Sequence, residues 1–219
     1  MTMKFQLNKT TLLAGAIFLF SASANAQSDA KATAILQKVS KLYKSYTTIK
    51  ATFTVTTKTA AGKSTSSSGT VWLKGNKYKL DYAGQEIFCN SKFVWTYNKT
   101  DNEVTKEIFK VKDNSITPND IFTIYNKDFK NAYEGPTVKN GKTYEVIKMV
   151  PKKKVNYSYL KLEIDKSTNK ITSLIQHFKN GTDVTMSVDT MTPNTAMADS
   201  FFEWDAKSHP GVSEIDLTK

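Results

Sequence analysis

Apolar and polar residues alternate along most of this chain, which is the pattern of half-buried β-strands. The alternation is clearest between Gly69 and Val104. Two sets of apolar residues there each share one side of a strand: Tyr78, Leu80 and Tyr82, then Phe93, Trp95 and Tyr97. Because successive side chains of a strand point to opposite faces, we expect a sheet with one apolar, aromatic face and one polar face.

The same period of two recurs before and after this stretch. Further alternating sets are Ala51, Phe53 and Val55, then Leu160, Leu162 and Ile164, then Ile171, Ser173 and Ile175, and last Val184, Met186 and Val188. Asn140-Gly141 and Asn180-Gly181 are typical hairpin turns. A final aromatic cluster, Phe201, Phe202 and Trp204, comes before a polar end. The pattern predicts about ten to eleven antiparallel strands, with no repeat and no internal domain boundary.

Two segments have helical spacing instead. In residues 28–46 the apolar positions recur every three or four residues, which predicts an amphipathic helix lying on an apolar surface. Thr117-Pro118-Asn119-Asp120 is a typical helix start. The four apolar residues that follow crowd into two turns: Ile121, Phe122, Ile124 and Tyr125. So short a helix needs the sheet for support, and we interpret it as a candidate lid.

The chain begins with a secretory leader. Lys4 and Lys9 precede the apolar run Leu12–Phe20, and Ala24-Asn25-Ala26 ends it, as in a signal peptide. The run is shorter than the roughly 20 residues of a membrane span. We therefore predict cleavage after Ala26 and a single soluble, exported domain over residues 27–219. Its first residue, Gln27, is not a cysteine that a lipid modifies.

Composition narrows the partners. The chain carries a net charge of +11, and every one of its 31 basic residues is a lysine. Arginine is the usual residue for reading phosphates and bases, so its absence argues against nucleic acid. A solvated coat is the first interpretation of the lysines, and an acidic partner or an anionic membrane surface the second. Cys89 is the sole cysteine, so an intrachain disulfide is excluded and a buried small hydrophobe is expected.

Motifs with a chemical mechanism are missing. The nine glycines are scattered rather than clustered in a phosphate-binding loop. His177 and His209 stand far apart, without the further ligands that a metal needs. There is no Gly-x-Ser-x-Gly nucleophile, and no carboxylate pair can be assigned to acid–base work. We therefore expect neither an enzyme nor a cofactor. A filled aromatic core and a lined apolar cavity both fit the aromatic face.

Several short motifs follow one another in a fixed order. They are the helix Ala30–Tyr46 leading into Ile49–Thr54, then Gly69–Lys74, Tyr78–Tyr82, Asn90–Asn98, Pro151, Leu160–Asp165 and Asn180–Thr182. In order and spacing they resemble the periplasmic outer-membrane lipoprotein carriers of the LolA family. The stretch Asn90–Asn98 is similar to the family's D-G-K-x-x-W-x-Y-x-P, and Ile49–Thr54 to its A-x-F strand. The resemblance covers nearly the whole chain after the leader.

The resemblance implies a fold that is mainly β with helices (α+β). In that fold an incomplete antiparallel barrel has a concave apolar face covered by helices. It also implies a monomeric periplasmic carrier that takes acylated lipoproteins from an ATP-driven exporter of the inner membrane to an outer-membrane receptor. On this interpretation the cavity for the acyl chains is lined by Phe53, Val55, Val71, Leu73, Tyr78, Leu80, Tyr82, Ile87, Cys89, Phe93, Trp95, Leu160 and Leu162. Its lid carries Ile121, Phe122, Ile124 and Tyr125.

The chain departs from the family's pattern at two places. Many members have an arginine that latches the lid, and Lys74 stands in that neighbourhood here, as a candidate latch. Asn90-Ser91 and Lys99 replace the usual Asp-Gly and Pro. An alternative from another class is a periplasmic lipid-sensing regulatory binding module, because a similar fold serves envelope-stress regulators. Those regulators usually add a second domain, for which this chain has no room.

Overall fold

The computed structural model describes residues 21–110 and 128–218, with side chains from residue 29 onward. In chain order its elements are α1 (Ser21–Lys44), β1 (Ile49–Lys58), β2 (Ser64–Lys74), β3 (Lys77–Tyr82), β4 (Gln85–Cys89), β5 (Phe93–Asn98), β6 (Glu103–Ile108), β7 (Phe129–Lys139), β8 (Lys142–Pro151), β9 (Tyr157–Asp165), β10 (Ile171–Phe178), β11 (Asp183–Pro193), the 3-10 helices η3 (Asp199–Phe202) and η4 (Ala206–Ser208), and β12 (Ser213–Asp216). The predicted lid and residues 1–20 of the predicted leader lie outside the described residues. Cleavage after Ala26 stays a prediction, at a position inside α1.

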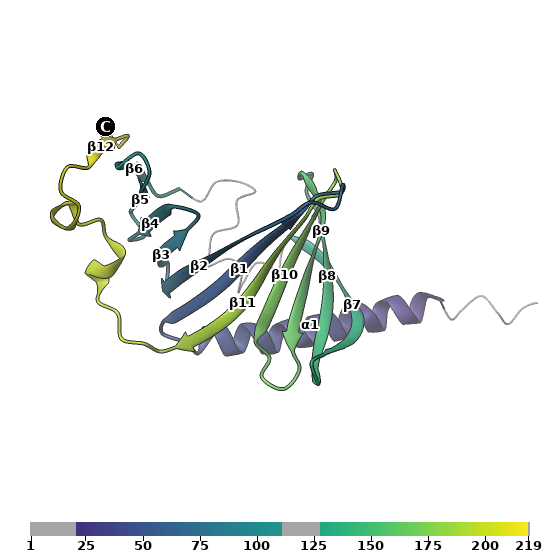
Figure 1. Cartoon of the computed structure of the whole chain (residues 1–219). Coiled ribbons are helices and arrows are strands. Elements are labelled where there is room, and N and C mark those ends of the chain that lie inside the picture. Colours follow the sequence, from purple (N-terminus) through teal and green to yellow (C-terminus); the bar gives the residue numbers. More distant parts are fainter. Residues whose placement is uncertain (1–20, 111–127, 219) are drawn as a thin grey trace, which may run out of the picture.

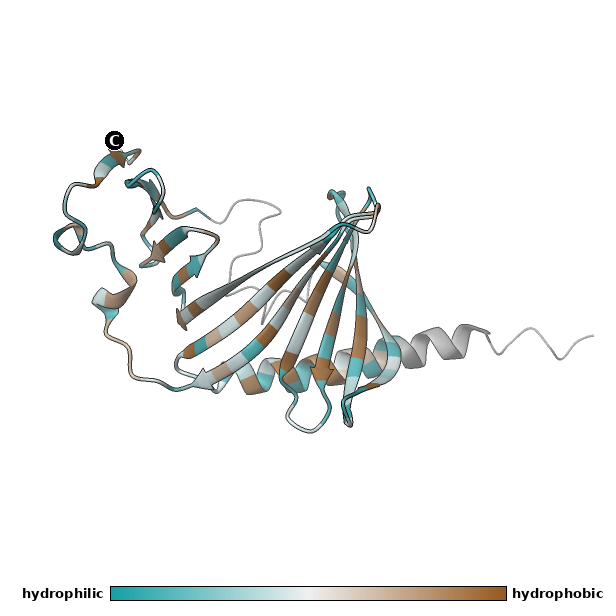
Figure 2. Cartoon of the chain, viewed as in Figure 1, coloured by the Kyte–Doolittle hydropathy of each residue, from teal (hydrophilic) through white to brown (hydrophobic). Residues whose placement is uncertain are grey.

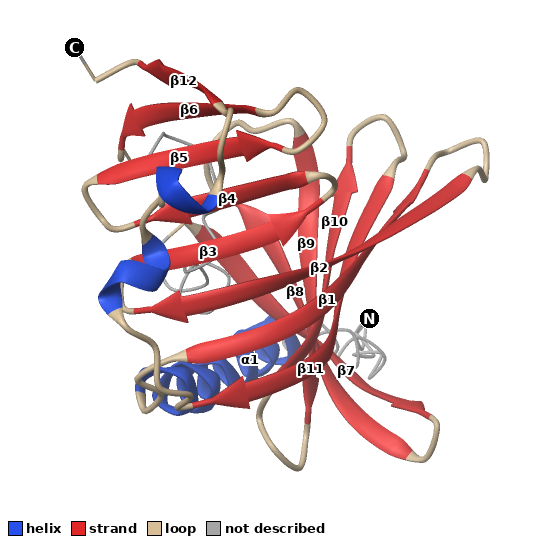
Figure 3. Cartoon of the chain, turned by 60° about the vertical axis from the view of Figure 1, so that its left-hand side comes forward, coloured by secondary structure: helices blue, strands red, loops and turns tan. Residues whose placement is uncertain are grey.

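All twelve strands join one sheet, in the order β12-β6-β5-β4-β3-β2-β1-β11-β10-β9-β8-β7. Neighbouring strands are antiparallel, except that β12 runs parallel to β6. Strands β12 and β7 form the two edges, so the sheet does not close on itself (Figures 1 and 3). The mainly β fold with an incomplete barrel is therefore confirmed. The strand number was one too low, because the short β12 carries no apolar alternation.

Turn chemistry connects the sequence to this order. Asn140 and Gly141 have φ angles of 49° and 73°, both positive, as a tight two-residue hairpin turn requires. This confirms the hairpin predicted between β7 and β8. Figure 2 shows bands of apolar residues alternating with polar ones along β1 and β8–β11. The backbone thus follows the period of two seen in the sequence.

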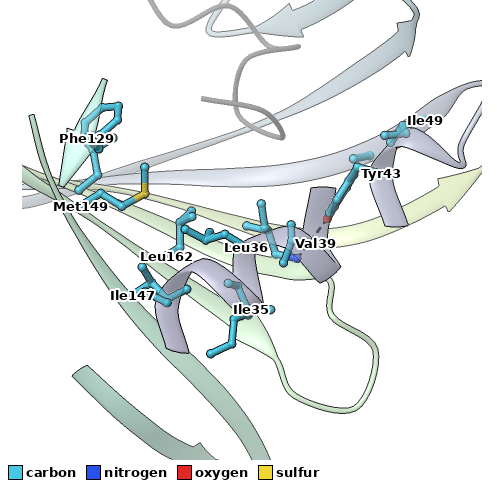
Figure 4. Packing of buried hydrophobic residues seen from close by; sticks show 14 of the residues in the cluster. Ile35, Leu36, Val39, Tyr43, Ile49, Phe129, Ile147, Met149 and Leu162 are labelled. Carbon is cyan, nitrogen blue, oxygen red and sulfur yellow. Dashed lines mark hydrogen bonds between the residues drawn. The ribbon is translucent and has the colours of Figure 1, made fainter. Parts of the chain in front are cut away.

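Helix α1 packs across one face of the sheet. Leu36 and Val39 are 1% and 0% exposed, and they lie against strands that contribute Ile147 and Leu162, which are equally buried (Figure 4). Burying one such side chain contributes about 1.5–3 kcal/mol relative to leaving it in water. The Tyr43 hydroxyl accepts a hydrogen bond of 3.1 Å from the backbone N–H of Ile171, which fixes the end of α1 to β10. The predicted amphipathic helix is confirmed.

One predicted alternation fails because of a bulge. The register between β10 and β9 shifts between Ile171 and Ser173. Ile171 is buried and Leu174, three residues later, pairs with Leu162. The bulge inserts one extra residue and so reverses the faces beyond it. Ile171, Ser173 and Ile175 were predicted to share one face, and this prediction was wrong.

The C-terminal segment lies over the other face of the sheet. Phe201 of η3 meets the Trp72 ring edge-on, with centroids 5.6 Å apart, and Trp204 meets Phe88 in the same way at 5.8 Å. Phe202 is 0% exposed. The chain then adds β12 beside β6 through backbone pairing. The aromatic cluster of the tail therefore attaches this segment to the sheet.

Candidate functional site

We call the face that packs against α1 the inner face, and the opposite one the outer face. Cross-strand pairs extend the inner face over the whole sheet, because residues directly opposite each other point the same way. Val71 pairs with Leu80, and Leu80 pairs with Ile87. On the other side of β1 the series continues through Val55, Met186, Leu174, Leu162 and Ile147. Figure 3 shows the sheet curling, so that β3–β6 lie in front of β8–β10.

Eleven of the thirteen residues predicted to line a cavity lie on the inner face, and they divide by burial. Six are core: Phe53, Leu73, Tyr78, Cys89, Leu160 and Leu162, each at most 8% exposed. Five are only half-buried: Val55, Val71, Leu80, Tyr82 and Ile87. The inner face is thus partly a packed core under α1 and partly an apolar surface on which the described side chains are only half-buried.

Phe93 and Trp95 were placed on this face, and that prediction was wrong. Cys89 pairs with Val94, and Phe88 pairs with Trp95. Phe93 and Trp95 therefore lie on the outer face. The reason is the turn between β4 and β5, which Asn90 closes by accepting hydrogen bonds from the backbone N–H groups of Lys92 and Phe93. Alternation fixes the faces within a strand, but the length of the turn decides how they carry over to the next strand.

Sequence reasoning missed several half-buried apolar residues of the inner face, and four of them bear on the site. They are Val94, Leu174, Met186 and Val188. Met186 and Val188 were part of a predicted alternation, so their common face was visible in the sequence. Leu174 and Val94 depend on a bulge and on a turn, which the pattern alone does not reveal. These four extend the half-buried part of the inner face from β5 across to β10.

The ionisable groups buried on the inner face favour their neutral forms. Burial, together with the neighbouring Cys89, raises the pKa of Tyr78 to about 12. Burial also raises the pKa of the Cys89 thiol, so the thiolate that would act as a nucleophile is disfavoured. Among the described residues, nowhere do three or more His, Cys, Asp and Glu side chains gather as a metal ion would require. Neutral buried groups among apolar side chains keep this part of the inner face apolar.

A glycine on β2 allows close packing on the inner face between β1 and β3. Gly69 lies between Phe53 on β1 and Tyr82 on β3. The two rings approach to a centroid distance of 5.6 Å. A Cβ atom at Gly69 would lie 2.7 Å from the Phe53 ring and 2.7 Å from the Asp81 carbonyl oxygen. The missing side chain therefore lets two aromatic rings meet over the backbone of β2.

Lys74 does not face the inner side, and its assignment as a lid latch stays a prediction, because the predicted lid lies outside the described residues. It shares the outer face with Trp72, and its Nζ lies 2.8 Å from Oδ1 of Asp199. Lys77 contacts Oδ2 of the same carboxylate at 2.7 Å, and Lys74 also donates to the Met197 carbonyl at 2.7 Å. These ammonium groups lower the pKa of Asp199 to about 2. Lys74 thus holds the C-terminal segment.

Comparison with protein families matches residues 44–205 to the outer membrane lipoprotein carrier protein LolA. Among solved structures, an uncharacterized conserved protein from Thermus thermophilus superposes with a TM-score of 0.58 at 12% identity, over 85% of this chain and 99% of that one. A LolA superfamily protein from Nitrosomonas europaea superposes with a TM-score of 0.46 at 13% identity, over 80% of this chain and 98% of that one. A putative outer membrane lipoprotein-sorting protein domain from Vibrio parahaemolyticus superposes with a TM-score of 0.47 at 11% identity, over 80% of this chain and 97% of that one. Curated protein sequences gave no significant match. In the described part of the chain, none of the helices has the length and apolar character to span a membrane.

Proposed function

The chain belongs to the LolA family of outer membrane lipoprotein carrier proteins, and on that premise we propose that it carries lipoproteins through the periplasm. It takes them from the inner membrane to the outer membrane, with their acyl chains against the inner face. The observation that supports this is the half-buried apolar surface on that face, which includes Val71, Leu80 and Val188. A side chain whose only role is to fill a core is normally more completely buried.

The energetics of acyl transfer require such a surface. Moving an acyl chain from a bilayer into water costs about 0.8 kcal/mol for each methylene group. A protein with several acyl chains therefore leaves the membrane only when another apolar surface receives them. The residues packed under α1, such as Ile147 and Leu162, keep the fold stable when the surface is empty. Loading and release then need differential affinity, and no bond is made or broken.

The proposal has two further partners, one at each end of the route. In this proposal an ATP-driven exporter of the inner membrane supplies the free energy for extraction. A receptor at the outer membrane completes the transfer by binding the acyl chains more tightly than the carrier does. Of the thirteen residues predicted to line the cavity, this proposal keeps the five that are half-buried on the inner face. Its surface comprises Val55, Val71, Leu80, Tyr82 and Ile87, with Val94, Leu174, Met186 and Val188 added.

Two adjacent residues of β10 provide a matched test. Leu174 faces the inner side and Ile175 the outer side, and both are half-buried. Leu174→Asn is expected to weaken binding of a fluorescent acyl probe at least about tenfold, because it places an amide on the acyl surface. The two variants should lower the melting temperature by similar amounts, because both side chains are half-buried. Ile175→Asn should nevertheless leave probe binding unchanged. Equal losses of binding in the two variants, or a wild type that does not bind the probe, contradict the proposal.

Release of lipoprotein from membranes distinguishes the carrier from the alternative, a lipid-sensing regulatory module. Incubated with inner-membrane vesicles that contain the exporter, lipoprotein and ATP, a carrier forms a soluble complex with the acylated lipoprotein. Mass spectrometry of that complex should show the intact acyl groups. A regulatory module would instead bind lipid without releasing lipoprotein, and it would bind a membrane-anchored signalling protein.

A further inference from the structure

The exposed side of α1 carries cations and almost no anions. Three exposed lysines lie on it, Lys38, Lys41 and Lys44, whereas the fourth, Lys31, turns toward β7, with its Nζ 3.9 Å from the centroid of the Tyr133 ring. At about 100° per residue, Lys41 lies diametrically opposite the buried stripe centred on Val39. Asp29 is the single acidic residue of the 24-residue helix. Lys38, Lys41 and Lys44 form no ion pair within the described part of the chain. The helix thus presents an unneutralised basic face.

The two ordinary explanations of surface lysines do not cover this pattern. Cations in the last turn stabilise a helix through its dipole, and Lys41 and Lys44 occupy that turn. Lys38 lies outside that turn. A face that is merely solvated usually intersperses acids with lysines, because like charges at a spacing of three or four residues repel. The spacing of Lys38, Lys41 and Lys44 becomes favourable only beside an external anion.

The same face is hollowed where the lysines gather. A surface hollow of about 650 Å³ is lined by Gln37, Ser40, Lys41, Lys44 and Ser45. Two ammonium groups, two hydroxyls and one amide supply hydrogen-bond donors. Phosphate oxygens are pure acceptors, so the hollow has the chemistry of a phosphate-bearing headgroup. In the structure the Ser45 hydroxyl donates a hydrogen bond of 2.6 Å to the Leu42 carbonyl.

Turns at the same end of the sheet add further charge. Ile171, which is tied to Tyr43 of α1, directly follows the turn that contains Lys166 and Lys170. The backbone N–H of Lys166 donates to the Thr143 carbonyl at 3.0 Å, so the start of β8, with the exposed Lys142, lies beside this turn. The basic face of α1 therefore continues onto the rim of the sheet.

We propose that the basic face of α1, together with these turn lysines, docks the protein onto a membrane surface that contains anionic phospholipid. The hollow at Lys41 and Lys44 receives a phosphate headgroup, and the remaining lysines contact neighbouring headgroups. Docking brings the end of the inner face that α1 covers close to the bilayer. The proposal goes beyond acyl-chain carriage and stands without it, since it depends on charge and not on the inner face.

The test is flotation of the purified protein with vesicles. Phosphatidylcholine vesicles with about 30% phosphatidylglycerol should bind the wild type at about 50 mM salt, and binding should vanish at about 500 mM. Vesicles of phosphatidylcholine alone should not bind it. Each lysine near an anionic surface changes the partition about fivefold. The double variant Lys38→Glu/Lys41→Glu should therefore lower the partition at least about twentyfold.

The matched control is Lys153→Glu/Lys154→Glu, in the exposed turn between β8 and β9. It changes the net charge equally and should keep vesicle binding within about threefold of the wild type. Equal losses in both double variants would mean that net charge alone acts, and would overturn the proposal, as would equal binding to the two kinds of vesicle. If inorganic phosphate displaces the vesicles at constant ionic strength, the hollow takes free phosphate and the membrane assignment is wrong. Binding of the acyl probe should be unchanged in both variants, so this test fails or succeeds separately from the carrier proposal.

Discussion

Single residues decide how much of the inner face is available. Gly69 carries no side chain, and the rings of Phe53 and Tyr82 close over it with centroids 5.6 Å apart. Glycine within a strand usually weakens it, because it adds no packing and is flexible when unfolded. Here it marks a close approach of neighbouring rings. The position is therefore a sensitive test of the packing on this face.

Gly69→Ala should destabilise the protein. The added Cβ would lie 2.7 Å from the Asp81 carbonyl oxygen, a backbone atom that cannot turn aside, and 2.7 Å from the Phe53 ring. Overpacking of this kind costs about 1–3 kcal/mol, and the melting temperature should fall by about 3–8 °C. Ser67→Ala is the control, since Ser67 is exposed and pairs with Val55 on the same face. An unchanged melting temperature in Gly69→Ala would contradict the packing described.

Tyr78 makes stability depend on alkaline pH. Burial raises its pKa to about 12, above the model-compound value of 10.0, so the folded protein favours the neutral phenol. In the unfolded chain the Tyr78 hydroxyl ionises near pH 10. The contribution of Tyr78 to folding stability is therefore complete below pH 10 and is lost as the pH rises toward 12. Urea midpoints measured between pH 9 and pH 12 should fall less steeply for Tyr78→Phe than for the wild type. Parallel curves for the two proteins would show that Tyr78 ionises freely in the fold.

At the scale of elements, predictability follows the kind of interaction that fixes each element. Helix α1 was predictable because its buried stripe, from Ala32 to Tyr43, is written as a spacing of three and four. The faces of β5 were not, because Asn90 sets them through hydrogen bonds in a turn. Strand β12 was not predictable either: all four of its residues are exposed, and it is placed by backbone pairing with β6 and by the polar contacts Asp216–Lys106 and Glu214–Trp204, none of which leaves a pattern in the sequence.

The C-terminal segment depends on an ion pair that can be removed. Asp199→Asn deletes the charge that Lys74 and Lys77 contact at 2.8 and 2.7 Å. Because Asp199 is exposed, the effect on global stability should be small, as for most surface ion pairs. Hydrogen exchange of residues 197–204 should nevertheless become several times faster, and exchange in β9 should not change.

The pH dependence of this contact has a defined sign. The pKa of Asp199 is lowered to about 2 from 3.8, so the contact is complete above pH 3.8 and is lost as pH falls toward 2. Raising the salt concentration should weaken it at neutral pH. Exchange of residues 197–204 that is equally slow in Asp199→Asn would show that the aromatic contacts of Phe201 and Trp204 hold the segment alone.

At the scale of the whole molecule, an open sheet carries a core on part of its inner face and a half-buried apolar surface on the rest. The mainly β fold and its incomplete barrel could be predicted, because alternation and the order of the motifs persist over the whole chain. The division of the inner face could not. Phe53 and Leu80 look alike in an alternating pattern, but only the position of α1 and of neighbouring rings makes one buried and the other half-buried.

The central claim is that acyl chains lie on the inner face, and photo-crosslinking tests it most directly. A benzophenone amino acid is placed at Leu80 on the inner face or at Trp95 on the outer face, and each protein is loaded with an acylated lipoprotein. The account predicts a covalent adduct, mapped by mass spectrometry to the acyl chains, from position 80 and none from position 95. A stable complex that crosslinks from position 95, or that forms without any adduct from position 80, would contradict it.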